Sequence, residues 1–349
     1  DLISHHTNTT GLLGGHLGGG GGKLGVMLFF CISRFLMNLL YIDKRWNAEA
    51  AFEFGRARVA RVIPLYLLVV FASFGASLLY GDATLLYLVT SENLVKHLVF
   101  HSGISVLWTI PVEVQFYLLF PLFWLIFQRL GPLALLAVMV FATLTVAHLG
   151  YPEWPGVVRV CGFFFAGMLV AMTASSDKVP RANWAFIGLA AIYALCFPGV
   201  RVALGFDFSN PPEGQVGKAL WTMPEYLILM TCFLWACLQS SWAEKLLGSG
   251  IMTFYGKISY SLYLLHTPVL LALAKLPWAH HYPVLSLAAV LGCSTLLAWL
   301  SYRFVEDPAR RIINRARLPR LPQWFVGGPD PKYPSKDNSL HKTRRSLTG

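Results

Sequence analysis

A run of 24 residues, from Ile104 to Phe127, is almost wholly apolar. A helix of that length can cross the roughly 30 Å hydrocarbon layer of a membrane with some tilt. One carboxylate, Glu113, lies near the middle of the run. An ionisable group at that depth costs about 2.5–3.5 kcal/mol on insertion scales, so it should face other protein groups or water and not lipid. The rest of the chain is therefore expected to supply helices that give Glu113 partners.

Similar apolar runs recur along the chain, and only 13% of its 349 residues are charged. A soluble domain has about 25%. The sequence therefore predicts an all-α fold, a polytopic bundle of transmembrane helices. Nine full spanning helices are expected, at residues 24–40, 62–80, 104–127, 131–149, 158–174, 185–198, 219–238, 254–274 and 284–302. No short-period repeat is evident.

The N-terminal residues and the basic residues predict the orientation. The chain starts at Asp1 without a basic leader, so no cleavable signal peptide is expected, and residues 1–10 are interpreted as the remnant of a tenth helix. Alternation of the loops places 20 of the 28 lysines and arginines on one face, which the positive-inside rule makes cytoplasmic. This placement explains the net charge of +11 without nucleic-acid binding. The expected organisation is a helix bundle at residues 1–311 and a basic, disordered cytoplasmic tail at 312–349.

Two arginines at the end of the predicted 41–61 loop suggest a phosphate site. Arg58 and Arg61 are three residues apart, so on a helix they share one face at the membrane surface. Guanidinium groups suit phosphate oxygens, although an ordinary positive-inside anchor has the same pattern. Glu306 follows the last predicted helix at the same membrane level. It is expected either to cap the basic patch or to pair with the arginines and preset them.

Glu113 and two histidines are candidates for chemistry. Glu113 can form a structural ion pair with Arg34 or Arg159, or it can orient a catalytic base or a substrate hydroxyl. His5 and His6 lie at the end of the expected helix remnant, and a neutral imidazole can take a proton from an alcohol. No third ligand accompanies them, so no metal site is expected.

A polar stripe marks the predicted helix 254–274. Ser259, Tyr263 and His266 recur at spacings of four and three residues on an otherwise apolar helix. Such a stripe is expected to face the bundle interior. Hydrogen bonding between helices explains it as well as a functional site does.

Four motifs in order resemble the acyltransferase-3 family, the ten-helix membrane enzymes that O-acylate cell-surface carbohydrates and related acceptors. The resemblance covers about residues 1–311. Residues 25–36 resemble G-V-x-x-F-F-x-x-S-G-F-L, with Arg34 where the family has Gly and Met27 where it often has Asp. The other motifs are Arg58-x-x-Arg61-x-x-Pro64-x-Tyr66; Trp108-Thr109-Ile110 with Glu113, Phe116 and Tyr117; and Ser259-Tyr260-Ser261-x-Tyr263-x-x-His266 with Glu306-x-Pro308.

The resemblance implies that the chain is a membrane O-acyltransferase of the bacterial inner membrane. It implies that His5 or His6 is the catalytic base, with Glu113 orienting it. The donor is expected to be cytosolic acyl-CoA, most often acetyl-CoA, held by Arg58, Arg61 and Glu306. The acceptor is expected to be a hydroxyl of a carbohydrate or lipid-linked glycan, with no bound cofactor and with membrane lipids as the remaining partners. The supporting polar residues are Trp108, Tyr117, Ser259, Tyr263 and His266.

Two alternatives stay open. The chain can be an exporter or transporter in which Glu113, Arg34 and His266 form a charge relay. Alternatively, it is a non-catalytic family member, disabled by Arg34 or by its unusual N-terminus, that binds CoA without turnover.

Overall fold

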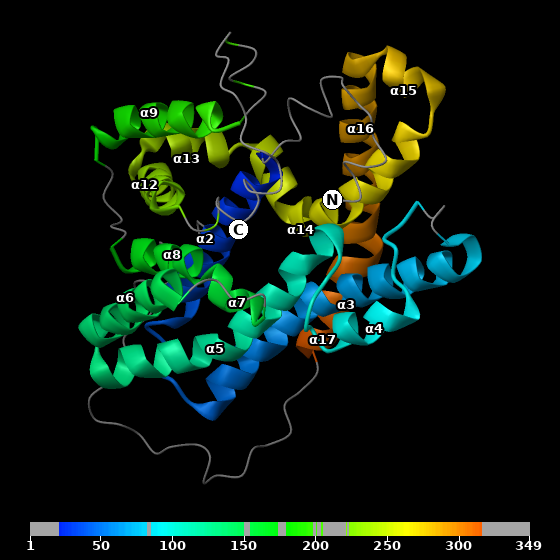
Figure 1. The fold of residues 1–349 in the computed structure, drawn as a ribbon. Helices are drawn as coiled ribbons and strands as arrows, with labels where there is room; N and C mark the ends of the chain where they lie inside the picture. The colour runs from blue at the N-terminus through cyan, green and yellow to red at the C-terminus, as the bar shows by residue number, and fades with distance from the viewer. Residues whose placement is uncertain are drawn as a thin grey trace.

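The computed structural model describes residues 21–81, 85–149, 154–173, 179–197, 200, 204, 221 and 223–315. His5, His6 and the tail from residue 316 onward lie outside these ranges. Every regular element within them is a helix, as Figure 1 shows. The all-α prediction is therefore confirmed.

The helices follow one another with short connections. In chain order they are α2 (Gly21–Tyr41), α3 (Ala48–Tyr80), α4 (Ser91–Leu98), η3 (Ser105–Trp108), α5 (Thr109–Leu130), α6 (Pro132–Leu149), α7 (Gly156–Arg159), α8 (Cys161–Thr173), α9 (Ala182–Leu195), α12 (Pro224–Gln239), α13 (Ser241–Leu247), α14 (Gly250–Ala274), α15 (Pro277–His281), α16 (Pro283–Ser301), the π-helical turn η4 (Tyr302–Glu306) and α17 (Asp307–Arg315).

Each of the nine predicted segments overlaps a helix, but the count of nine full spans is not confirmed. Four helices within the described chain are long and apolar enough to cross a membrane. A fifth candidate is the pair α12 and α13, which is bent by 88° between its two parts. Three apolar helices, α6, α8 and α9, are shorter. The chain is thus an integral membrane protein with at least four candidate spans, at Gly22–Tyr41, Ala48–Tyr80, Ser105–Leu130 and Val284–Arg315.

Helix α3 begins fourteen residues before the predicted start, so the expected 41–61 loop is wrong. Residues 48–61 are rich in Ala, Glu and Arg, which favour helix even though the segment is too polar for an apolar-run criterion. The Asn47 side chain accepts a hydrogen bond from the Ala50 backbone N–H at 2.7 Å and caps the first turn. Arg58 and Arg61 consequently lie inside a 33-residue helix and not at its edge.

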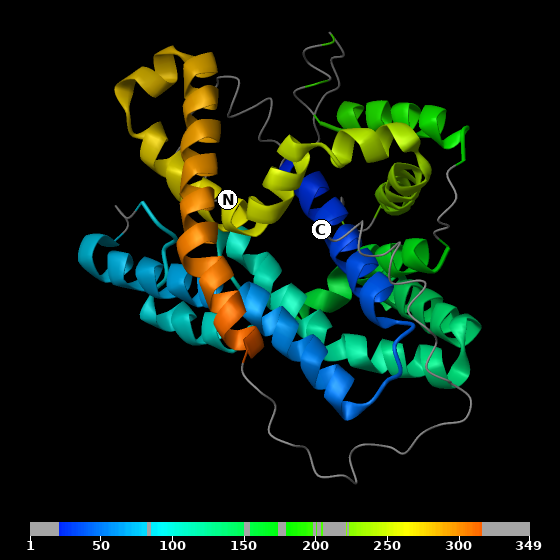
Figure 2. The same cartoon turned by 180° about the vertical axis from the view of Figure 1, so that it is seen from behind.

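Helix α5 connects two hydrophobic clusters. Phe116 and Phe120 join a cluster formed mainly with α2 and α8, whereas Ile110 joins a second cluster with α3, α4, η3 and α14. Figures 1 and 2 show α3 and α5 running side by side, with α16 standing to one side of them. A substitution on α5 therefore affects both halves of the molecule.

The crossing of α2 and α8 is the tightest packing in the described fold that depends on a glycine. A Cβ added at Gly167 of α8 would lie 2.0 Å from the backbone oxygen of Cys31 on α2. About two turns beyond Cys31 on α2, Asn38 Nδ2 donates to the carbonyl of Met168, the residue after Gly167, at 3.1 Å. Small residues allow helix backbones to approach in this way in membranes. The position of α2 is therefore set by direct contact with the backbone of α8.

Helix α14 contains a proline, and the backbone carbonyl that it leaves without a helical donor accepts a hydrogen bond from a tyrosine. Pro268 has no N–H, so the carbonyl of Leu264 loses its usual helical donor. Tyr87 Oη donates to that carbonyl at 2.6 Å. The segment that precedes α4 is thereby fastened to α14.

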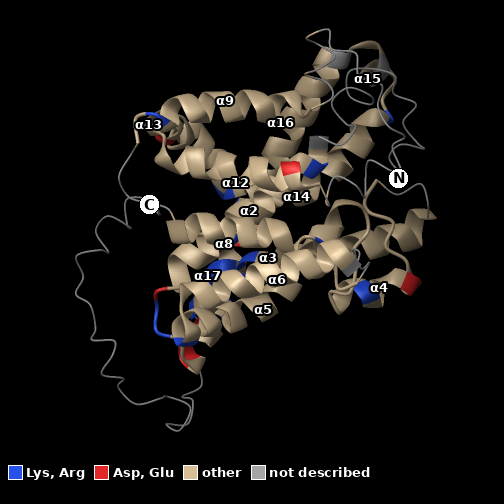
Figure 3. Ribbon diagram, turned by 60° about the vertical axis from the view of Figure 1, so that its left-hand side comes forward, with Lys and Arg blue, Asp and Glu red and all other residues tan. Residues whose placement is uncertain are grey.

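Charged residues are rare along the helices and gather in a few places. Figure 3 shows long helical stretches without any charge, and clusters of Lys, Arg, Asp and Glu near α17 and the connection from α2 to α3. Three carboxylates and one arginine of the described residues nevertheless lie buried, namely Glu113, Glu306, Asp307 and Arg34. Ionisable side chains buried among membrane helices commonly mark functional sites.

Candidate functional site

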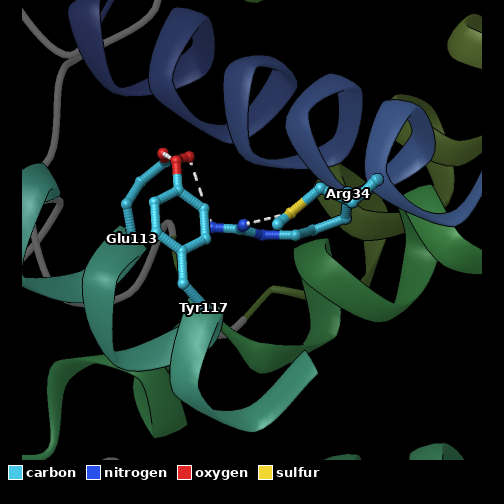
Figure 4. Close-up of polar contacts among 4 residues, drawn as sticks. Arg34, Glu113 and Tyr117 are labelled. Atoms are coloured by element: carbon cyan, nitrogen blue, oxygen red, sulfur yellow. Dashed lines mark hydrogen bonds and ion pairs between the residues drawn. The ribbon is translucent and has the colours of Figure 1, made fainter. Parts of the chain in front are cut away.

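Glu113 lies between two partners from its own and a neighbouring helix (Figure 4). Arg34 of α2 donates through Nη2 to Glu113 Oε1 at 3.2 Å, and the Tyr117 hydroxyl, one turn further along α5, donates to Glu113 Oε2. Arg34 is 0% and Glu113 3% exposed. The interpretation of Glu113 as one half of a structural ion pair with Arg34 is confirmed.

Aromatic rings enclose the arginine. The Arg34 guanidinium carbon lies 4.1 Å from the Phe116 ring centre and 4.2 Å from that of Phe164, a geometry typical of cation–π contacts. Its Nη1 also contacts the Met37 sulfur at 2.9 Å. Arg34 is thus held by charge and by rings on two helices, and the ion pair fixes the rotation of α2 against α5.

Arg58 and Arg61 of α3 are half-buried and point to different partners. The Arg58 guanidinium carbon lies 5.8 Å from the Phe54 ring centre and 6.0 Å from that of Tyr41. Its Nε is buried and, within the described chain, has no hydrogen-bond partner. Such a group costs free energy unless something supplies an acceptor. The charge of Arg61, in contrast, interacts with Glu306.

Glu306 is 4% exposed and is held by α14. Ser261 Oγ donates to Glu306 Oε2 at 2.9 Å, while the adjacent Tyr260 hydroxyl donates to the Val62 carbonyl at 2.7 Å. Two neighbouring residues of α14 thus fix Glu306 and the α3 turn that contains Arg61. The direct pairing predicted between Glu306 and the arginines is replaced by a hydrogen bond from Ser261 and a longer-range attraction to Arg61.

Comparison with known proteins identifies the family. Residues 3–303 match the family model Acyl_transf_3, described as an acyltransferase domain. The chain belongs to the acyltransferase-3 family.

The relatives of this acyltransferase-3 chain are distant and longer. It is 23% identical over 355 residues to "O-acetyltransferase OatA" of Staphylococcus aureus (strain NCTC 8325 / PS 47), covering 89% of this chain and 55% of the relative. It is 24% identical over 348 residues to "Putative peptidoglycan O-acetyltransferase YrhL" of Bacillus subtilis (strain 168), covering 87% and 54%. The chain thus spans about half the length of these curated relatives. No solved structure matches it significantly.

The polar stripe expected on α14 of the acyltransferase-3 chain does not face the interior as a unit. Ser259 bonds the Gly256 carbonyl of its own helix at 3.0 Å, and His266 Nδ1 lies 2.8 Å from the carbonyl of Tyr263. Tyr263 reaches η3, where it donates to the Val106 carbonyl at 3.0 Å. The buried face of α14 is displaced from the stripe and contains Ile258, Tyr260, Ser261, Leu264, Thr267 and Pro268. Tyr263 therefore contacts another helix as expected, whereas Ser259 and His266 bond to their own helix, as hydroxyl and imidazole groups can.

Trp108 ends η3 in an aromatic cluster. Its ring centre lies 5.4 Å from that of Trp221 in an edge-to-face arrangement and 6.0 Å from that of Phe30. The other candidate partner of Glu113, Arg159, lies over Trp108 at 5.7 Å. Trp108 therefore supports the start of α5 and, with it, the position of Glu113.

A buried histidine that sequence analysis missed lies between α3 and α4 of the acyltransferase-3 chain. His97 is 1% exposed, and its Nδ1 lies 3.0 Å from the hydroxyl of Tyr66. Its Nε2 has no hydrogen-bond partner within the described residues. The available signal was the i, i+3 spacing of Leu94 and His97, which puts His97 on the apolar face of α4.

His97 should make stability depend on pH. Burial lowers the pKa of His97, which lies outside the spanning helices, below its ordinary value of 6.5. Below that pH the unfolded chain takes up a proton that the folded chain does not, so stability falls as pH falls. We expect the unfolding temperature of the purified protein to drop between about pH 7.5 and 5.5, and to drop less in His97→Gln.

The exposed His281 provides the control for this prediction. His281→Gln removes a histidine side chain from the surface and leaves His97 in place, so it should keep the wild-type dependence on pH. An identical pH dependence in wild type and His97→Gln would contradict the assignment to His97.

Proposed function

We propose that this chain is a membrane O-acyltransferase that transfers an acyl group, most simply acetyl, from acyl-CoA to a hydroxyl of a carbohydrate or lipid-linked glycan. The match to the family over residues 3–303 carries the proposal, and the relatives named as O-acetyltransferases support it. The setting we propose is a bacterial inner membrane with the C-terminus in the cytoplasm. There the α3 arginines face the compartment that contains acyl-CoA.

The donor site that we propose contains Arg58, Arg61 and Glu306. CoA carries phosphate groups, and arginine binds phosphate through charge-assisted and often bidentate hydrogen bonds. The Arg58 Nε is buried and has no hydrogen-bond partner among the described residues, which is consistent with a site that a ligand completes. Ser261 holds Glu306 close enough to Arg61 for electrostatic attraction, which favours one orientation of that guanidinium before the donor arrives.

The base that we propose is His5 or His6, both within the segment that matches the family but outside the described residues. The imidazole takes the proton of the acceptor hydroxyl, and the oxygen attacks the thioester carbonyl. The C–S bond then breaks, the CoA sulfur leaves as a thiolate that is protonated, and an ester remains on the acceptor. Apolar helices around the site limit hydrolysis of the donor by water.

Glu113 is better suited to hold the site together than to contact the base. Its two oxygens accept from Arg34 and Tyr117. Through Arg34 it fixes α2, the helix that follows His5 and His6 in the chain. We therefore assign Glu113 a positioning role, in which it sets where the N-terminal segment meets the donor.

Release of CoA tests the donor site. With acetyl-CoA and a glycan acceptor, Arg58→Ala and Arg61→Ala should each raise the KM for acetyl-CoA about 10- to 100-fold, the effect of losing one charge-assisted hydrogen bond of 1.5–3 kcal/mol. His5→Ala and His6→Ala separate the two base candidates, since removal of the base lowers kcat. The exposed Arg129, at the end of α5, provides a charge-matched control. Unchanged kinetics in both α3 variants and in both histidine variants would overturn the proposal.

A transporter remains the second candidate, because a buried pair such as Arg34 and Glu113 also suits a charge relay. His266, the third member of that relay, bonds to its own helix. Addition of CoA separates the candidates: it should raise the unfolding temperature of a CoA-binding protein and leave that of a transporter unchanged. A non-catalytic member would bind CoA and release none from acetyl-CoA.

A further inference from the structure

Two arginines of α17 lie next to the proposed donor site. Asp307, at the start of α17, is 7% exposed and bonds both of them. Its Oδ1 accepts from Arg310 Nη2 at 3.1 Å and its Oδ2 from Arg311 Nη2 at 2.6 Å. One buried carboxylate therefore fixes two guanidinium groups that are successive in sequence.

The arginine pair belongs to the same electrostatic cluster as Arg61. The charges of Arg61 and Arg310 both act on Glu306, one from α3 and the other from α17. The two helices pack against each other, and Figures 1 and 2 show them side by side. A ligand that contacts Arg61 is thus within the field of the α17 pair.

The two sets of arginines differ in depth. Arg58 and Arg61 are half-buried within α3, whereas the side chains of Arg310 and Arg311 are 42% and 63% exposed. Each ion pair with Asp307 engages one nitrogen of a guanidinium group that has five N–H donors. The α17 pair can therefore keep its bonds to Asp307 and still donate to a phosphate.

We propose that Arg310 and Arg311 bind the 3′-phosphate of the donor CoA. The inference rests on the proposed function and extends its donor site to α17. In CoA the diphosphate lies nearer the thioester than the ribose 3′-phosphate does. When the thioester points into the membrane, the diphosphate meets the deeper arginines of α3 and the 3′-phosphate meets the exposed pair. Asp307 sets the spacing of the pair before the ligand binds.

Comparison of CoA with 3′-dephospho-CoA tests this. In nanodiscs of neutral lipid, the wild-type protein should bind CoA at least tenfold more tightly than 3′-dephospho-CoA, as expected for a phosphate held by charge-assisted hydrogen bonds. Arg310→Gln and Arg311→Gln should bring that ratio close to one, mainly by weakening CoA. Arg315→Gln removes the same charge from the exposed end of the helix and should keep the ratio.

Replacement of Asp307 separates its proposed role from general charge attraction, because the two predict opposite effects on CoA binding. Asp307→Asn adds one positive charge, so general attraction would strengthen CoA binding. Loss of the carboxylate that holds Arg310 and Arg311 should instead reduce the preference for CoA over 3′-dephospho-CoA. The unfolding temperature of the variant shows whether it is folded. A preference that is unchanged in Arg310→Gln and Arg311→Gln would overturn the inference.

Lipid phosphate is the competing source of the same chemistry. If the pair binds lipid headgroups, the two arginine variants should differ from wild type only in nanodiscs that contain phosphatidylglycerol, and this too would overturn the inference. Wild-type protein that binds neither CoA nor 3′-dephospho-CoA would remove the proposed function itself. Binding of CoA with an unaltered preference in the α17 variants removes only the part assigned to α17.

Discussion

Replacement of Arg34 by methionine is expected to destabilise the protein by about 3–5 kcal/mol, because it leaves Glu113 as a buried carboxylate without its cationic partner. Glu113→Gln should cost a similar amount, since the fully buried guanidinium then has no counter-charge. The double variant Arg34→Met/Glu113→Gln should recover most of the loss. It removes both charges together and leaves an amide oxygen that can accept from Tyr117. Unfolding of the four proteins in mixed detergent micelles measures the coupling as a double-mutant cycle.

Two results would contradict this account. Additive losses in the double variant would mean that the two side chains do not stabilise each other in the folded protein. A double variant that is stable but releases no CoA from acetyl-CoA would assign Glu113 a direct role in the chemistry. A stable and active double variant is expected if its role is to position α2.

Gly167→Ala should destabilise the protein by about 1–3 kcal/mol even though alanine favours helices. The new Cβ would lie 2.0 Å from the Cys31 carbonyl oxygen, which is a backbone atom and cannot rotate away. Helix α2 must then move off α8. Because α2 carries Arg34, turnover should fall along with stability.

Gly188→Ala on α9 is the matched control. It also places a Cβ on a helical glycine, but no other side chain or neighbouring helix of the described residues lies within 4 Å of that position. The only expected effect is the gain in helix propensity, up to about 1 kcal/mol. Equal unfolding free energies for the two alanine variants would show that α2 and α8 do not touch at Gly167.

The apolar runs were sufficient to locate the longer apolar helices, but not the short or polar ones such as α4 and α17. Where their ends fall depends on other forces, and α3 is the clearest example. Its first turns are amphipathic and contain Phe54, which packs in the core, together with Glu49 and Arg56. A search for long apolar stretches passes over such a segment, while helix propensity and the Asn47 cap would have detected it.

Sequence analysis found most of the charged groups of the candidate site but not all of their contacts. Arg34 was identified as a possible partner of Glu113, because two opposite charges inside apolar helices have few other ways to be stabilised. The contribution of Tyr260 and Ser261 depends on a rotation of α14 that is set by packing against α3 and η4. Local spacing carries little information about such contacts, and His97 was missed for a similar reason.

The π turn η4 lies between α16 and α17, which would otherwise form one continuous α-helix with a single regular arrangement of side chains around its axis. A π turn accommodates one more residue than an α turn does, which is equivalent to a single-residue insertion in a continuous helix. It rotates everything after Glu306 by about 100° relative to α16. The gain or loss of one residue at this turn during evolution would change which side chains α17 presents to α3. The membrane-facing surface of α16 would stay as it is, so this short turn is where descendants of the chain can diversify what they bind at low cost to the fold.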